Sequence, residues 1–69
     1  MANLDVRGLS CPLPVLKTQK ALEKGIEELR VIGSGNTAKH NVSKFAKAKG
    51  YQVNVTSETD DEWCLMIKK

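Results

Sequence analysis

A chain of 69 residues has room for one domain with a modest core, because a domain of this size buries only about 60% of the surface of its unfolded chain. Hydrophobic residues make up 41% and charged residues 28%, which is typical of an ordered globular domain and excludes a disordered tail. The net charge of +3 is mild, and neither a signal peptide nor a membrane-spanning apolar run is present. We therefore expect a single domain over residues 1–69, located in the cytoplasm and without a membrane partner.

The N-terminal third of the chain predicts a strand followed by a helix. Leu4 and Val6 alternate with polar residues, so residues 3–7 fit a short strand that a Gly-Leu-Ser turn ends. A helix is expected over residues 12–24, closed by Gly25 in a left-handed conformation. The residues at helical spacing that we expect to face the core are Val15, Gln19, Leu22 and Ile26.

A second strand is expected over residues 28–33, ELRVIG. Leu29 and Val31 would point inward, because side chains alternate between the two faces of a strand. Gly33 and Gly35 would end this strand.

A second helix is expected over residues 36–49, capped by Asn36 or Thr37 and stopped by Gly50. Its apolar stripe consists of Ala38, Val42, Phe45 and Ala46. Phe45 on such a stripe is expected in the core rather than as a platform for a nucleic-acid base.

Two strands joined by a hairpin loop complete the chain. Residues 51–57 alternate between apolar and polar side chains, which predicts an edge strand, whereas residues 63–67 are apolar on both faces and predict an interior strand. Residues 58–61 have the composition of a hairpin loop. The order β-α-β-α-β-β predicts an α/β two-layer sandwich, with a mixed four-stranded sheet and two helices packed on it.

The stretch SCPLP places a cysteine at the junction of the first strand and the first helix. With Cys11 as the N-cap, Pro12 is the first helical residue, where its fixed φ suits the helix and its missing N–H is not needed. Pro14 removes a second donor, which leaves the amides of Leu13 and Val15 as the donors that could reach the sulfur. The helix dipole favours an anion here, and the pKa of cysteine falls at helix N-termini. Because cysteine is not a preferred cap, we expect this sulfur to be reactive.

Other interpretations of the cysteines stay open. Cys11 could be a small apolar residue between strand and helix, since free cysteine is often buried. No second cysteine follows at two-residue spacing, which excludes a dithiol redox motif, and no neighbouring His or Asp offers a general base. Cys64 is expected to pack on the strand face opposite Trp63, with a resolving thiol as the alternative, and His40 is expected to be solvated. A zinc site made from Cys11, His40 and Cys64 lacks a fourth ligand, so we expect no metal.

Charges are unevenly distributed along the sequence. Lysines crowd the second helix, and acidic residues cluster in the terminal hairpin; they are Lys39, Lys44, Lys47 and Lys49, and Glu58, Asp60, Asp61 and Glu62. A solvated helix face is the first interpretation of the lysines. A docking surface for acidic partners or RNA is the second, and it predicts salt-sensitive association.

The stretch LDVRGLSCPLPVLKTQKAL resembles the signature of the TusA/SirA-like sulfur-carrier family, in which Cys-Pro-x-Pro leads into the first helix. The segment GYQVNV and a terminal hairpin ending in LMIKK extend the resemblance over nearly the whole chain. The family implies a sandwich similar to the C-terminal domain of a bacterial translation initiation factor. In that fold both helices cover one face of the sheet, and the last strand is inserted between the second and third.

The resemblance also implies a sulfurtransferase-like carrier in which Cys11 holds a transient persulfide and needs no other cofactor. A cysteine desulfurase or other sulfurtransferase would be the donor. A DsrE-like or thiolase-type protein would be the acceptor, in tRNA thiolation, sulfur oxidation or cofactor assembly. Pro12 and Pro14 would fix the turn, and Gly8 would allow its backbone conformation. Arg7 would contact a partner. These supporting residues are Arg7, Gly8, Pro12, Leu13 and Pro14.

One segment departs from the tRNA-thiolation branch, which has Asp-Pro-Ala after the second strand and a later Ile-Pro. This chain has GSGNTAKHNVSKFAKAKGY, which resembles YedF-type proteins associated with selenium metabolism. A selenium-metabolism adaptor is therefore one alternative function. An RNA-binding regulatory module is another, but one Phe, one Tyr and one Trp are too few for the usual stacking platforms, so we expect no direct contact with nucleic acid.

Overall fold

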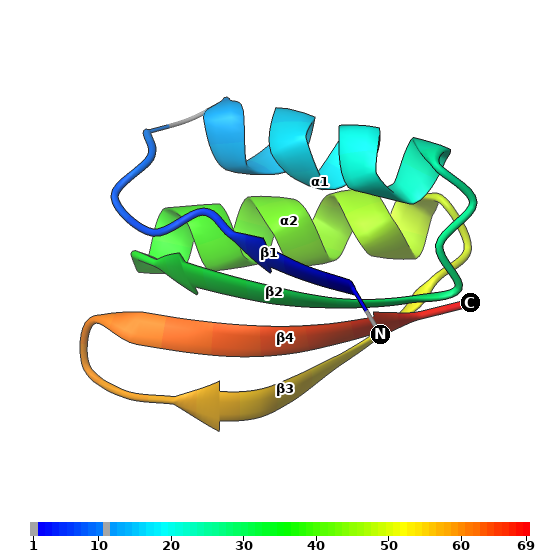
Figure 1. Cartoon of the computed structure of the whole chain (residues 1–69). Coiled ribbons are helices and arrows are strands. Elements are labelled where there is room, and N and C mark those ends of the chain that lie inside the picture. The colour runs from blue at the N-terminus through cyan, green and yellow to red at the C-terminus, as the bar shows by residue number, and fades with distance from the viewer. Residues whose placement is uncertain (1, 11) are drawn as a thin grey trace.

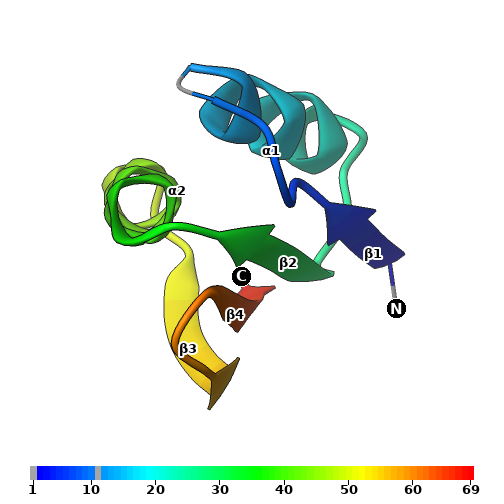
Figure 2. The ribbon, with the colours of Figure 1, turned by 90° about the vertical axis from the view of Figure 1, so that its left-hand side faces the viewer.

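The computed structural model describes residues 2–10 and 12–69, and shows a four-stranded sheet with both helices on one face (Figures 1 and 2). The strand order is β1-β2-β4-β3, with β1 and β2 parallel and the other two pairs antiparallel. The predicted two-layer sandwich, with its last strand inserted between the second and third, is therefore confirmed. The elements are β1 (Ala2–Asp5), α1 (Leu13–Glu23), β2 (Glu28–Ser34), α2 (Asn36–Ala48), β3 (Gln52–Glu58) and β4 (Glu62–Lys68).

Buried and more exposed side chains alternate along β2 and β4, and the buried ones form the core between the sheet and the helices. Leu29 and Val31 of β2 are fully buried, as predicted. β4 alternates in the same way, so Trp63 is buried and Cys64 lies half-buried on the open face of the sheet. The buried apolar residues are Val6, Leu22, Leu29, Val31, Val42, Ala46, Trp63, Leu65 and Ile67.

The first helix begins one residue later than predicted. Pro12 rather than Cys11 is the N-cap residue of α1, and its carbonyl accepts the hydrogen bond of the Leu16 N–H at 3.1 Å. The buried stripe is also shifted, because Thr18 rather than Gln19 faces the sheet. The Thr18 hydroxyl donates to the Pro14 carbonyl at 2.8 Å, which satisfies this polar group inside the core.

The second helix is capped by backbone rather than by a side chain. β2 continues through Gly33, and Gly35 is the N-cap residue of α2 in place of the expected Asn36 or Thr37. Gly35 has a φ of +85°, a conformation that glycine adopts without a steric cost. Its carbonyl accepts the first helical hydrogen bond from the Lys39 N–H at 3.2 Å.

The edge strand β3 contains a register shift between Val55 and Ser57. Because of this bulge, Glu58 pairs with Trp63 and so lies on the helix side of the sheet. There its carboxylate forms an ion pair with the Lys39 ammonium of α2 at 2.8 Å. The bulge thus links the edge strand to the helix layer.

Candidate functional site

The turn that precedes position 11 is held by backbone and side-chain hydrogen bonds. The Leu9 N–H donates to the Val6 carbonyl at 3.3 Å, and Gly8 between them has a φ of +75°, as the third residue of a type II turn requires. The Gly8 N–H donates to Ser34 Oγ at 2.9 Å, at the end of β2. Gly8 thus has the backbone conformation that glycine adopts without a steric cost, and its support of the site stays a prediction.

Arg7 is engaged with two carboxylates of its own chain. Its guanidinium approaches Asp5 to 2.8 Å and Glu62 to 3.6 Å, and its backbone N–H donates to Asp5 Oδ1 at 3.0 Å. The side-chain hydrogen bond from Arg7, assisted by the backbone one, lowers the pKa of Asp5. The same side-chain hydrogen bond raises the pKa of Arg7. Arg7 thus joins the start of the turn to the beginning of β4, and its contact with a partner stays a prediction.

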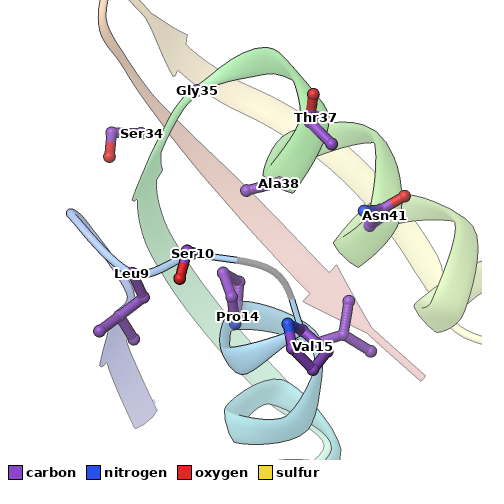
Figure 3. Close-up of a pocket in the computed structure, with 10 residues that line it drawn as sticks. Leu9, Ser10, Pro14, Val15, Ser34, Gly35, Thr37, Ala38 and Asn41 are labelled. Carbon is purple, nitrogen blue, oxygen red and sulfur yellow. The ribbon is translucent and has the colours of Figure 1, made fainter.

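An open pocket of about 200 Å³ lies beside this turn, between the first turns of α1 and α2 (Figure 3). One wall comes from the turn and α1 and includes Leu9, Ser10, Pro12 and Pro14. The other comes from the end of β2 and the start of α2 and includes Ser34, Gly35, Thr37 and Ala38. Cys11 lies outside the described residues, but its two sequence neighbours, Ser10 and Pro12, both line the pocket.

The electrostatic character of the pocket follows from the two helix N-termini at its walls. Each helix dipole places roughly half a positive charge at its N-terminus. Neither α1 nor α2 has an acidic residue in its first turn, and within the described part of the chain no side chain caps either helix. Nothing in those two first turns therefore offsets the positive ends of the dipoles, and the pocket suits an anion.

The first turn of α1 offers fewer donors than the sequence suggests. Pro12 and Pro14 have no N–H, and the Leu13 N–H donates to the Ser10 carbonyl at 2.9 Å. Leu13 itself is exposed, with 43% of its surface accessible. An anion in the pocket would therefore be held more by the two dipoles than by α1 amides.

Sequence reasoning located one wall of the pocket and missed the other. Ser34 and Gly35 lie at least twenty residues after the motif, yet they face Ser10 and Pro14 across the pocket. A signal was available, because β1 and β2 were both predicted and parallel neighbours bring the segments after them to the same sheet edge. The polar, glycine-containing segment GSGNT, residues 33–37, spans the end of β2 and the start of α2 at that edge.

The other candidate residues lie apart from this site. His40 is exposed on α2, and Cys64 lies on the opposite, open face of the sheet. Among residues 2–10 and 12–69, no group of three or more His, Cys, Asp or Glu side chains is placed to bind a metal ion. None of the helices described is both long and apolar enough to cross a membrane.

Comparison with known proteins gives one consistent result. The family model described as sulfurtransferase TusA matches residues 2–69. A Methanocaldococcus jannaschii protein, provisionally named a sulfur carrier protein, is 46% identical over 71 residues, covering 100% of this chain and 95% of its own. Sulfur carrier protein TusA of Allochromatium vinosum is 32% identical over 69 residues, covering 97% and 91%. The crystal structure of a SirA-like protein from Desulfitobacterium hafniense superposes with a TM-score of 0.86 at 27% identity, covering 99% and 96%.

Proposed function

Because the chain belongs to the sulfurtransferase TusA family of sulfur carriers, we propose that it accepts sulfur as a persulfide on Cys11 and passes it to a partner thiol. The observation that carries the proposal is the pocket between two helix N-termini, because both sequence neighbours of Cys11 line it. A thiolate or persulfide anion beside that pocket is stabilised by the positive ends of both dipoles.

The proposed transfer exchanges one sulfur–sulfur bond for another. The Cys11 thiolate attacks the outer sulfur of a donor persulfide, the donor's S–S bond breaks, and the donor cysteine leaves as a thiolate. Cys11 then carries the outer sulfur as a persulfide, with no net oxidation or reduction. An acceptor thiolate attacks that outer sulfur in the second step, and the Cys11 thiolate is the leaving group.

The surroundings of the pocket suit a carrier that must also release its cargo. Because the prolines and the engaged Leu13 amide leave α1 few hydrogen-bond donors, the anion is held by charge rather than by a set of directed bonds. The pocket is open, so a partner's cysteine can approach it. We assign the donor role to a cysteine desulfurase and the acceptor role to a thiol-bearing protein of the DsrE-like or thiolase type.

Mass spectrometry after incubation with cysteine and a cysteine desulfurase tests the proposal. The Cys11 peptide should gain the mass of one sulfur atom, and a reductant should remove it. Cys64→Ser is the matched control because Cys64 lies on the open sheet face, and this variant should load normally. A Cys11→Ser variant that still gains sulfur would overturn the proposal.

A further inference from the structure

We propose that the outer side of the helix layer is the docking surface for the protein that donates sulfur, and that this donor presents acidic side chains around an apolar contact. The inference rests on the proposed function and adds the surface through which the donor binds. We call this surface the basic helix face and define it by Leu13, Leu16, Lys17, Lys20, Lys44 and Lys47, all of which are exposed.

The charges of the molecule separate between its two layers. Together with their C-cap residues Lys24 and Lys49, α1 and α2 carry seven of the eleven basic residues and one of the eight acidic residues, Glu23. The strands and turns carry the other seven acidic residues. Such a separation attracts an acidic protein to the helix layer and turns that layer toward it during approach.

The structure also shows which lysines are available to a partner. Lys39 forms an ion pair with Glu58 at 2.8 Å, and the Lys49 ammonium lies 5.8 Å from the centre of the Phe45 ring. The four lysines of the basic helix face form no ion pair with any residue that the structure describes. Their charges are therefore uncompensated within the described chain.

Two exposed leucines lie at the end of this face nearest the site. Leu13 and Leu16 each have 43% of their surface accessible, and residues three apart on a helix share one side. Leu13 follows Cys11 by two residues, and Leu16 lies within the next turn of α1. A protein whose persulfide reaches Cys11 would cover both leucines, while its acidic side chains meet Lys17 and Lys20 one turn further on.

The combination of exposed leucines and lysines on the basic helix face favours a protein rather than RNA as its partner. Trp63 is buried, Phe45 and Tyr51 are partly buried, and none of the residues that define the basic helix face is aromatic, so this face offers no ring on which a base could stack. Exposed leucines beside lysines instead match the apolar centre and charged rim of a protein interface.

Charge reversal on the two faces of the molecule tests the inference. Lys20→Glu/Lys44→Glu reverses two charges of the basic helix face, and Arg30→Glu/Lys68→Glu reverses two exposed charges on the open sheet face. With a cysteine desulfurase that loads the wild-type chain, we measure the loading rate of Cys11 against carrier and salt concentrations. The helix-face variant should need at least about tenfold more carrier for half-maximal rate, with an unchanged maximal rate and a weaker salt dependence. The sheet-face variant should load as the wild type does.

The outcomes separate this inference from the proposed function. If no desulfurase loads the wild-type chain, both the proposed function and the proposed docking surface are wrong. If loading occurs but both variants behave alike, the docking surface alone is wrong. Slower discharge to an acceptor protein with unchanged loading would make the acceptor the occupant. Loss of binding to a labelled tRNA with unchanged loading would make the face an RNA surface, and either result overturns the inference.

Discussion

The indole N–H of Trp63 donates to the backbone carbonyl of Gly35 at 2.8 Å, although 28 residues separate them. Trp63 belongs to the buried face of β4, and Gly35 is the N-cap residue of α2 and part of the pocket wall. The same ring covers Gly33, where an added Cβ would collide with it. One core side chain therefore connects the interior of the sheet with the rim of the candidate site.

Gly33→Ala should destabilise the protein because the Trp63 ring fills the space that the new methyl group needs. Overpacking of this kind costs about 1 to 3 kcal/mol, and we expect a loss of unfolding free energy in that range by urea titration. Gly33 does not have a positive φ, so steric overlap rather than backbone strain is the cause.

A double-mutant cycle provides the control for this prediction. Trp63→Leu removes the ring atoms that approach Gly33, so Gly33→Ala should cost much less in that background. Equal costs in both backgrounds would contradict the proposed overlap.

Gly8→Ala should weaken the turn before Cys11, because Gly8 has a φ of +75° and a Cβ is disfavoured there. We expect a loss of about 1 to 2 kcal/mol of unfolding free energy and slower sulfur loading. Gly8→Asn is the informative companion, since asparagine tolerates this conformation and no neighbouring atom lies within 4 Å of an added Cβ. If the two variants lose equal stability, backbone conformation is not the cause.

Ser34→Ala removes the hydroxyl that accepts the Gly8 N–H at 2.9 Å. The hydrogen bond is exposed, so the loss should be near the lower end of the usual 0.5 to 1.5 kcal/mol, or about 0.5 kcal/mol. Hydrogen exchange of the Gly8 amide is the sharper measurement and should accelerate. Ser43→Ala on α2 should leave that exchange rate unchanged.

Arg7→Gln should raise the pKa of Asp5, because it removes the guanidinium whose side-chain hydrogen bond is the largest cause of the lowered pKa, while the backbone N–H of residue 7 remains. The folded-state pKa lies below the unfolded value of about 3.9, so the stabilisation is present above that value and is lost as the pH falls through the folded pKa. An NMR titration of the Asp5 carboxyl should give a midpoint below about 3.9 in the wild type and a higher one in Arg7→Gln. Lys68→Gln should leave the midpoint in place, and an unmoved midpoint in Arg7→Gln would contradict the assignment.

Local patterns predicted most of the fold because they report which face of each element is buried. Alternation identified Leu29 and Val31 as core residues and placed Cys64 on the other face of β4. Helix boundaries were less accurate because capping depends on backbone geometry at one residue. The expected caps were Cys11 for α1 and Asn36 or Thr37 for α2, whereas Pro12 and Gly35 occupy those positions.

Local sequence patterns were sufficient to predict the order of the elements, the interior position of β4 and the location of the Cys-Pro-Leu-Pro motif at a strand–helix junction. Each of these follows from neighbouring residues, whose periodicity and turn chemistry carry the information. Tertiary structure alone decided that Ser34 supports the Gly8 turn, that Trp63 holds Gly35, and that Lys39 is paired with Glu58. These contacts join residues 19 to 28 positions apart, and a pairwise contact at that range depends on strand register and helix placement rather than on any local pattern.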